Sequence, residues 1–531
     1  MHKVSKITFL LFHKMDEVMR YQFIIFTILT SIAASAQSLP NRYQEDVFDT
    51  WTENSEVLFS TDVPQPVPGG GFYEWLTGYP LNVDEFETTD EDLYMDIFQP
   101  DGDTLSMRPL IIICFGGGFL TGSKDHWSIR LLAEQLARRG FVTATIDYRL
   151  GMNIFDSDLS NRAVYRGLQD GRSAVRFFRA DAAGSNIYNI DPDQIFIGGH
   201  SAGAFIATHN AYLDKDSERP LSTYVWTQDS TDDCPDLGCL DCAGDNQEYS
   251  GHANAIFSLA GALGFTDFIE ASDDPTMVMF HSEDDGTVPY TNGEPFSDIL
   301  WLVVGSDLPN VYGSSDMADQ ADSVGLPYSF LSYTDRGHGV HEDDPVLYTD
   351  IISGVEDWFY DDRLKPKNVT LTGDSTVCSD ALYSSYHASS ISGGYYDWVI
   401  DHAESITGDA FSTDVSVVWE EDIPDLKVSL VPYNMLRARG DSLHITVNKQ
   451  DVKTNTWSGE NGLWTDIAEW SQLRLPRYCD DVIIPTNSLT NVLTLPPNVQ
   501  SVVRSVSVSE QALLIISSGS SIIIKDKDTE E

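Results

Sequence analysis

The sequence predicts a doubly wound α/β domain with a mostly parallel sheet and flanking helices, followed by two smaller all-β modules. Between residues 37 and 362, apolar strand-like runs alternate with helix-like stretches, as in proteins built from βαβ units. Residues 365–450 instead contain short alternating strands and no long helix, a pattern typical of an Ig-like β-sandwich. Residues 454–531 contain short apolar segments separated by Gly, Ser and Asn, which predict a small β-solenoid-like or sandwich module.

The arrangement of apolar residues predicts the strands and helices of the first region. Continuous apolar runs are expected of strands that are buried on both faces of a parallel sheet, and they occur at 110–115 (LIIICF), 141–148 (FVTATIDY) and 194–199 (QIFIGG). Apolar residues at helical spacing predict helices at 130–140, 163–183 and 202–213. Gly140 suits the end of the first helix, because glycine readily adopts the left-handed conformation found there.

The charge balance excludes two classes of partner. The 531 residues include 82 Asp and Glu against 32 Lys and Arg, a formal net charge of -50. A field of this sign repels polyanions, so nucleic acid and anionic membrane surfaces are not expected partners. The same acidity is compatible with a protein that works outside the cell, or simply with the habit of the organism.

The N-terminus has the features of an export signal. Arg20 precedes an apolar run at 23–29, and Ala-Ser-Ala at 34–36 follows as a cleavage site. We therefore expect residues 1–36 to be a signal peptide, with a possible true start at Met19, and the mature chain to begin at Gln37. The run is short for a membrane span, so we expect no stable membrane insertion and a secreted or cell-surface protein.

Six cysteines are present, and an export route permits disulfides. Three of them gather in one polar loop, where a single local disulfide or a zinc knuckle is conceivable: Cys234, Cys239 and Cys242. The sequence suggests no partner for the other three, which are Cys114, Cys378 and Cys479.

The strongest chemical motif is Gly-His-Ser-Ala-Gly at 199–203, a G-x-S-x-G placed directly after a predicted strand and before a predicted helix. Glycines permit the tight turn between the two elements, and the turn presents the hydroxyl of Ser201 above the sheet edge. The following helix N-terminus points free N–H groups at developing negative charge. These features predict a nucleophilic serine, with His200 as a packing residue inside the turn.

The partners of a nucleophilic serine are expected later in the chain. The segment HSEDDGTVPY follows an apolar strand and offers Asp285 as the acid, with Glu283 and Asp284 as rivals. The segment RGHGVHE offers His338 between two glycines, with His341 as the rival base. The chain order Ser201, Asp285, His338 is the order of one large hydrolase class.

Residues from about 93 to 358 resemble secreted bacterial carboxylesterases of the α/β-hydrolase superfamily, in particular the feruloyl-esterase-like and lipase-like groups. The stretches that carry the resemblance include LYMDIFQP, GGGFLTGSK, DYRLG, DPDQIFIGGHSAGA and HSEDDGTVPY. The resemblance implies an oxyanion hole made by the backbone N–H groups of Gly117, Gly118 and Ala202, and a reaction without cofactor or metal. Most relatives place His or Tyr before the glycine triplet, whereas this chain has Phe115.

The C-terminal region resembles PKD-like modules of secreted bacterial proteins through Tyr-Asp-Trp at 396–398 and Val-Val-Trp at 417–419. We expect the tryptophans at 457, 464 and 470 to pack in a core, with contact to a surface or polysaccharide as the alternative. The acidic segment 214–251 could form a cap over the site or a solvated loop.

Together these observations predict a secreted serine esterase that cleaves small or polymeric carboxylic esters through an acyl-enzyme. The alternatives are a serine peptidase of the prolyl-oligopeptidase type, which uses the same triad, and a non-catalytic surface adhesin built on the β modules. The prediction for the β modules is a role in location or substrate attachment, because every candidate for the chemistry precedes residue 362.

Overall fold

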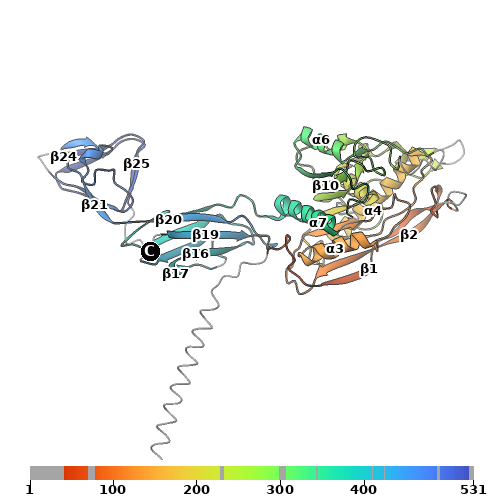
Figure 1. Cartoon of the computed structure of the whole chain (residues 1–531), viewed down its shortest axis with the longest axis horizontal. Coiled ribbons are helices and arrows are strands. Elements are labelled where there is room, and N and C mark those ends of the chain that lie inside the picture. The colour runs from red at the N-terminus through yellow and green to blue at the C-terminus, as the bar shows by residue number, and fades with distance from the viewer. Residues whose placement is uncertain are drawn as a thin grey trace, which may run out of the picture. The chain divides into compact units, whose positions relative to one another are not determined.

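The computed structural model describes residues 41–524 apart from 70–73, 75–77, 228–232, 298–305, 342–344, 410, 422, 424 and 487–490. The predicted signal peptide, the possible start at Met19 and the expected mature terminus Gln37 lie outside the described residues. The chain divides into two compact units (Figure 1). The α/β unit comprises Pro40–Pro366 together with Asn434–Arg439, and the β unit comprises Lys367–Tyr433 and the residues from Gly440 onward.

The α/β unit is built on one eight-stranded sheet with the strand order β1-β2-β4-β3-β5-β8-β10-β12. The strands are β1 (Trp51–Pro68), β2 (Val83–Pro100), β3 (Leu110–Cys114), β4 (Val142–Ile146), β5 (Ile195–His200), β8 (Ala255–Leu259), β10 (Thr276–Ser282) and β12 (Tyr328–Tyr333). Strand β2 is antiparallel to both of its neighbours, and all pairs from β4 to β12 are parallel. The predicted mostly parallel sheet is therefore confirmed.

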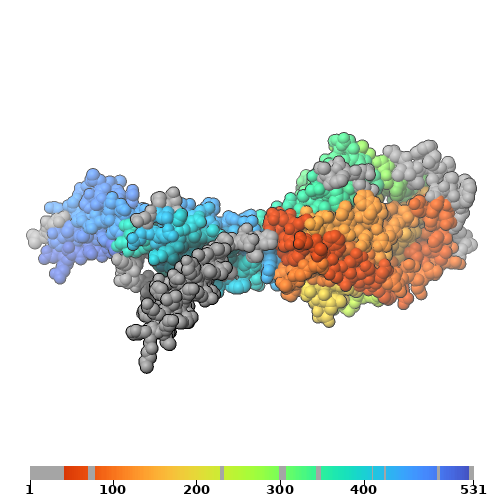
Figure 2. Space-filling view, turned by 60° about the horizontal axis from the view of Figure 1, so that its bottom comes forward, coloured from red at the N-terminus to blue at the C-terminus, as the bar shows by residue number. Residues whose placement is uncertain are grey.

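Two strands of this sheet, β1 and β2, form a long antiparallel hairpin that the apolar pattern did not predict. Both strands have 18 residues, and many of their side chains are exposed. Figure 2 shows this hairpin, in red and orange, along the surface of the α/β unit. A strand with one face in solvent carries polar residues, so it lacks the continuous apolar run that marks the central strands.

The helices lie on both faces of the sheet. They are α3 (Trp127–Arg138), α4 (Ser157–Ala183), α5 (Ala202–Tyr212), α6 (Ser314–Val324) and α7 (Pro345–Phe359), which continues as a π-turn at Tyr360–Leu364. The crossover from β3 to β4 runs in the opposite direction along the sheet to the crossovers from β4 to β5 and β5 to β8. Because such crossovers are right-handed, α3 covers one face and α4 and α5 cover the other. This arrangement confirms the predicted doubly wound fold.

Helix α4 begins earlier than the predicted helix at 163–183. The side chain of Asp156 accepts hydrogen bonds from the N–H groups of Asp158 and Leu159, which caps the helix start. The cap adds a polar first turn that the apolar spacing could not reveal.

The reversal of crossover direction also places the candidate site. Strands β3 and β5 are neighbours, but the connections that follow their carboxyl ends run over opposite faces of the sheet. In open α/β sheets, such a reversal creates a crevice at the carboxyl ends of the strands. The glycine triplet follows β3 and Ser201 follows β5, so both lie at this crevice.

Short elements connect the main ones. They are the 3-10 turns at Asp216–Glu218, Leu221–Thr223 and Thr266–Phe268, and the strand pairs β6 (Trp226–Thr227) with β7 (Asp233–Cys234) and β9 (Ala262–Leu263) with β11 (Tyr312–Gly313). Among the helices of the described residues, none combines the length and the apolar character needed to cross a membrane.

The first half of the β unit contains two four-stranded sheets. One has the order β13-β15-β18-β17 and the other β14-β20-β19-β16. Val377, Trp419 and Val428 come from both sheets and pack in one buried cluster, as in a sandwich. The strands are β13 (Leu371–Gly373), β14 (Thr376–Cys378), β15 (Tyr383–Ala388), β16 (Tyr395–Asp401), β17 (Ala403–Thr407), β18 (Asp414–Trp419), β19 (Asp425–Tyr433) and β20 (Leu443–Gln450). The expected β-sandwich is confirmed, and its PKD-like character stays a prediction.

The second half of the β unit is a small parallel solenoid. Its strands pair in parallel as β21-β23-β26, β22-β24-β27 and β25-β28, so each turn adds one strand to each sheet. The strands are β21 (Lys453–Thr456), β22 (Asn461–Leu463), β23 (Asp480–Ile484), β24 (Asn491–Leu495), β25 (Gln500–Val503), β26 (Ser505–Val508), β27 (Ala512–Ile516) and β28 (Ser521–Ile524), with a 3-10 turn at Ile467–Glu469. Because its strands pair in parallel, this module is a solenoid and not the alternative β-sandwich.

Two details of the β unit answer questions that the sequence left open. Trp457, Trp464 and Trp470 are at most 1% exposed and form the core of the solenoid, so they are not available to contact a surface or sugar. Cys378 and Cys479, for which the sequence suggested no partner, form a disulfide with Cα atoms 5.3 Å apart. The pairing escaped sequence reasoning because 101 residues separate the two cysteines and neither has a local partner.

Candidate active site

The predicted nucleophile occupies a strained turn between β5 and α5. Ser201 has φ 52° and ψ -118°, a conformation that L-residues rarely adopt. A Cβ atom at Gly199 would lie 2.3 Å from the carbonyl oxygen of Cys114, and one at Gly203 would lie 2.2 Å from the same oxygen. Both glycines are therefore required where the turn passes the end of β3. The turn holds Ser201 nearly buried, at 4% exposed.

The glycine triplet after β3 runs directly against this turn. A Cβ atom at Gly116 would lie 3.3 Å from the Cβ of Ser201, and one at Gly117 would lie 2.0 Å from the carbonyl oxygen of Thr121. Gly117 and Gly118 have φ values of 137° and 62°. Side chains are thus excluded from the loop, and its backbone approaches the serine closely.

The backbone N–H groups of Gly117, Gly118 and Ala202 make no hydrogen bond to any acceptor in the described ranges. Ala202 is the first residue of α5, where N–H groups lack intrahelical partners. Free N–H groups next to a serine hydroxyl are the donors that an oxyanion requires.

Phe115, directly before the glycine triplet, supports the glycine loop. Its ring stacks on Tyr148 with centroids 4.1 Å apart, and the Tyr148 hydroxyl donates to the Phe115 carbonyl oxygen at 2.9 Å. A Cβ atom at Gly122 would also touch the Phe115 ring. The loop is therefore anchored by stacking and by one hydrogen bond.

Asp285 and His338 are hydrogen-bonded to each other. The Nδ1 atom of His338 lies 2.8 Å from Oδ2 of Asp285. Oδ1 of Asp285 accepts from the N–H groups of Thr287 and Val288 at 2.8 and 2.9 Å. Burial would raise the pKa of Asp285, but the hydrogen bonds from histidine side chains outweigh it and hold the pKa well below its ordinary value. The carboxylate is therefore ionised at neutral pH.

The rival acids occupy other positions. Glu283 and Asp284 are exposed, and Asp284 accepts hydrogen bonds from Ser282 Oγ and the Gly337 N–H. Asp284 thus shapes the loop that carries His338, while Asp285 contacts the imidazole itself.

The rival base His341 is 1% exposed, whereas the His338 side chain is 24% exposed. Burial lowers the pKa of His341 to about 3. His341 packs edge-on against the ring of His200 at 4.6 Å between centroids. Its position is that of a core residue, and His338 is the histidine that faces the crevice.

His200 does more than pack. Its Nε2–H donates to the carbonyl oxygen of His338 at 3.0 Å, which ties the serine turn to the histidine loop. Burial lowers the pKa of His200 well below its ordinary value, and the neighbouring histidines lower it further. Within the described residues, Ser201 is linked to His338 through this neighbour and not through a hydrogen bond of its own hydroxyl.

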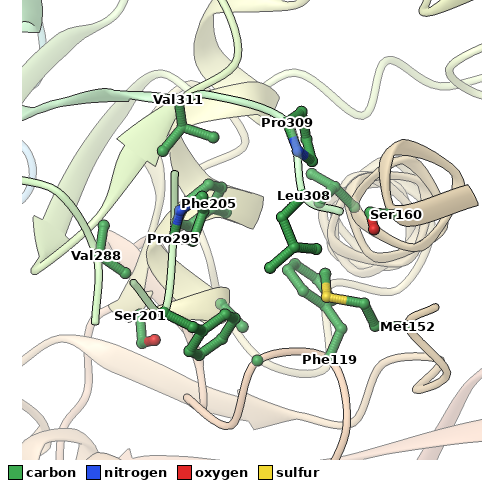
Figure 3. Close-up of a pocket in the computed structure, with 14 residues that line it drawn as sticks. Phe119, Met152, Ser160, Ser201, Phe205, Val288, Pro295, Leu308, Pro309 and Val311 are labelled. Atoms are coloured by element: carbon green, nitrogen blue, oxygen red, sulfur yellow. The ribbon is translucent and has the colours of Figure 1, made fainter. Parts of the chain in front are cut away.

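An apolar pocket opens beside Ser201 (Figure 3). Figure 3 shows Ser201 and Val288 on one side and Phe119, Met152 and Leu308 on the other. The remaining lining residues are Gly118, Ser160, Val164, Ala202, Phe205, Pro295, Phe296, Pro309 and Val311. The accessible volume of the pocket is about 50 Å³.

The segment 214–251 is anchored to α4 at several points, although many of its residues are exposed. Arg162 donates to the carbonyl oxygens of Ser222 and Pro235, and Arg172 and Arg176 both pair with Asp241. None of the described residues of this segment lines the pocket beside Ser201, so the structure gives the cap hypothesis no support.

The cysteines of this segment distinguish a local disulfide from a zinc knuckle. Cys239 and Cys242 form a disulfide, and Cys234 is a buried free thiol. Two ligands of the zinc-knuckle alternative are thereby unavailable, so the local-disulfide hypothesis is the better one.

One residue at the site was missed by sequence reasoning. His281 is fully buried at the end of β10, and its Nε2 lies 3.2 Å from Oδ2 of Asp285. It directly precedes the acidic turn in HSEDD, which is the only signal the sequence offers.

The model of the family described as BD-FAE matches residues 95–270, which include the glycine loop and Ser201 but neither Asp285 nor His338. The matched residues make up about a third of the chain and lie within its mostly parallel α/β unit. Among curated relatives, Neuroligin-like protein glit-1 of Caenorhabditis elegans is 37% identical over 132 residues, which is 24% of this chain and 16% of that protein. Gut esterase 1 of the same organism is 37% identical over 99 residues, 18% of this chain and 17% of that protein. Arylacetamide deacetylase of Bos taurus is 31% identical over 137 residues, 25% of this chain and 32% of that protein.

The chain is thus similar to only part of these relatives, since it spans less than a third of the length of each. Among solved structures, esterase 2 of the planctomycete Thermogutta terrifontis is 22% identical, with a TM-score of 0.37, over 52% of this chain and 92% of that chain. One structure of that esterase has propionate bound, with 54% of this chain and 94% of that chain covered at 22% identity and a TM-score of 0.37.

Proposed function

We propose that this chain is an exported serine esterase that hydrolyses carboxylic esters, with Ser201 as nucleophile, His338 as base and Asp285 as acid. The observation that carries the proposal is the 2.8 Å hydrogen bond between His338 and Asp285, on a loop tied to the strained serine turn. A nucleophile, a base and a group that orients the base are the parts such a reaction needs.

The hydrogen bond fixes the role of each histidine nitrogen. Because Nδ1 donates its proton to Asp285, the neutral ring of His338 keeps a lone pair on Nε2. Nε2 can then accept the proton of Ser201 as the serine attacks. The ionised carboxylate stabilises the imidazolium that forms. Serine–histidine hydrogen bonds are often long in free enzymes and shorten with substrate bound.

The proposed reaction has two halves. The Ser201 oxygen bonds to the ester carbon, and the carbonyl oxygen becomes an oxyanion held by the N–H groups of Gly117, Gly118 and Ala202. The bond to the alcohol oxygen breaks as His338 returns its proton to that oxygen. A water molecule then gives a proton to His338 and attacks the acyl-enzyme, and the acid leaves as Ser201 is protonated again.

The apolar pocket favours esters with a short acyl chain. Ser160 and Ser201 supply its only hydroxyl groups among the described residues. At roughly 10–15 Å³ for each water-sized group, a cavity of about 50 Å³ holds about four such groups. The acyl chain would enter this pocket, where Leu308 and Met152 lie across from Ser201 (Figure 3).

The two alternative functions have less support. The described residues of the β unit form a sandwich and a solenoid, whereas a prolyl-oligopeptidase-type peptidase usually carries a large propeller. An adhesin would have no need for a strained serine turn, side-chain-free glycines and a buried ionised acid in one crevice.

Export is supported by the sequence of residues 1–36 and by two disulfides, since disulfides persist in oxidising compartments. We further propose that the β unit serves location or attachment to a surface or polymeric substrate. With the three solenoid tryptophans buried, such contacts would rest on other residues.

The test is hydrolysis of p-nitrophenyl acetate, butyrate and octanoate by the purified full-length chain. Ser201→Ala should reduce kcat by about a millionfold while the circular dichroism spectrum is unchanged. His338→Ala should lower kcat by several orders of magnitude. Its matched control, His341→Ala, should lower kcat at most a few-fold, measured on protein whose circular dichroism spectrum is unchanged. Labelling with a fluorophosphonate should add its mass to the peptide containing Ser201. Near-normal turnover by Ser201→Ala would refute the proposal.

A further inference from the structure

The carboxylate of Asp285 receives two histidine side chains, not one. His338 Nδ1 lies 2.8 Å and His281 Nε2 lies 3.2 Å from the same oxygen, Oδ2. The Asp285 and His281 side chains are both 0% exposed. Oδ1 is already occupied by the N–H groups of Thr287 and Val288. Three donors thus hydrogen-bond to the carboxylate, and the Nε2–H of His281, which also faces the Val288 carbonyl oxygen, lies within reach of it as a fourth. The proposed mechanism does not use His281.

The surroundings of His281 determine which of its nitrogens carries the proton. Nε2 faces only acceptors, namely Oδ2 of Asp285 and the carbonyl oxygen of Val288, which is also 3.2 Å away. Nε2 must therefore be protonated. Nδ1 lies 3.0 Å from Oγ of Ser314, the fully buried first residue of α6, whose hydroxyl can donate to the neutral ring.

We propose that His281 is a positioning residue for the proposed triad, which fixes the orientation of the Asp285 carboxylate and limits its basicity toward His338. Ser314 in turn fixes the tautomer of His281. The proposal rests on the proposed function of Asp285 and His338.

Two measurable effects follow from the loss of the His281 donor. The carboxylate would be free to rotate away from His338, and small misplacements of catalytic groups lower kcat by one to two orders of magnitude. In addition, Oδ2 would serve His338 alone, so the negative charge would stabilise the imidazolium more strongly. The acid limb of the kcat/KM profile would therefore move upward by about one pH unit.

Other titratable groups face this pair and could contribute to the profile. They are Tyr290, whose ring lies 5.6 Å from His281, the buried His200 and His341 beside His338, and Asp284 on the neighbouring turn. All of them are unchanged in the variants below, so a difference between two variants isolates His281.

The experiment compares two amides at one position. The side-chain nitrogen of His281→Gln can reach the position of Nε2 and donate to Asp285. The shorter His281→Asn reaches only the position of Nδ1, so it can contact Ser314 but not Asp285. Activity of the full-length chain on p-nitrophenyl acetate is measured from pH 5 to pH 9. We expect His281→Asn to lose about tenfold to a hundredfold in kcat and to show the shifted acid limb, and His281→Gln to recover most of both.

The matched control is His209→Asn, the same substitution at a buried histidine that hydrogen-bonds to backbone groups of Phe205 and Gly264 and not to the triad. It should leave the acid limb unchanged. Equal kinetics of His281→Asn and His281→Gln, or an acid limb identical to the natural chain in both, would overturn the positioning role. If the natural chain shows no hydrolysis that depends on Ser201, the proposed function itself fails, which is a distinct result.

Discussion

The α/β unit should lose stability in mild acid because it buries neutral histidines, and His209 provides the clearest case. His209 lies on α5 and is 5% exposed. Its Nδ1–H donates to the Phe205 carbonyl oxygen at 2.8 Å, and its Nε2 accepts from the N–H of Gly264 at 3.2 Å. Protonation of Nε2 would break the second bond inside the core. Burial accordingly lowers the pKa of His209 to about 4.

The sign and size of the effect follow from the two pKa values. The folded-state pKa of about 4 lies below the ordinary value of 6.5, so the unfolded chain binds this proton first as the pH falls. The stability contributed by the neutral ring is present above pH 6.5 and is lost progressively down to pH 4. Between pH 7 and pH 5 the free energy of unfolding should fall by about 2 kcal/mol through His209 alone.

The assay uses a reporter that belongs to the α/β unit alone. Cys114 is a free thiol in the buried strand β3, so its labelling by a thiol reagent in increasing urea reports the opening of this sheet. Unfolding free energies are compared at pH 7 and pH 5 for the natural chain and for His209→Asn. Other titrating groups contribute equally to both proteins and cancel in the comparison. If the variant loses as much stability in acid as the natural chain, His209 is not the buried neutral group described above.

Two further predictions concern the crevice. Gly117→Ala should lower kcat by about a hundredfold to a thousandfold, because its Cβ would lie 2.0 Å from the Thr121 carbonyl oxygen and displace an oxyanion donor. Gly102→Ala, at a positive φ but with no atom within 4 Å, is the control that should keep kcat; equal losses in both would place the oxyanion donor elsewhere. Leu308→Ala should raise the ratio of kcat/KM for octanoate over acetate esters by about tenfold or more. Leu221→Ala, 77% exposed and outside the apolar pocket, should leave that ratio unchanged, and an unchanged ratio in Leu308→Ala would refute the acyl assignment.

The central fold was predictable because its strands are buried on both faces. Continuous apolar runs such as LIIICF are typical of strands in a parallel sheet, and their alternation with helix-like stretches indicates βαβ topology. The serine turn was predictable for a similar local reason, since it is flanked by two glycines at which a Cβ atom would lie within 2.3 Å of the Cys114 carbonyl oxygen. The roles of Ser201, Asp285 and His338 stay predictions, although the structure places the last two within hydrogen-bond distance.

Features that depend on distant parts of the chain were not predictable. His281 stands at the end of a buried strand, where a histidine looks like any core residue until its neighbour across the turn is known. The pairing of Cys378 with Cys479 similarly requires the two halves of the β unit to be packed first.

The α/β unit is discontinuous in sequence, and this has a consequence for how the chain is made. Leu436 and Ala438, from the segment Asn434–Arg439, are buried in the same core as Tyr43, and the Tyr43 hydroxyl donates to the Leu436 carbonyl oxygen. A domain that ends at one point in the sequence can complete its core as soon as that point leaves the ribosome. Here the sheet and helices up to Leu364 emerge about 70 residues before their last core side chains arrive. The growing chain therefore passes through a stage in which the α/β unit has all its strands but an unfilled edge of its core, and factors that bind nascent chains would meet it in that state.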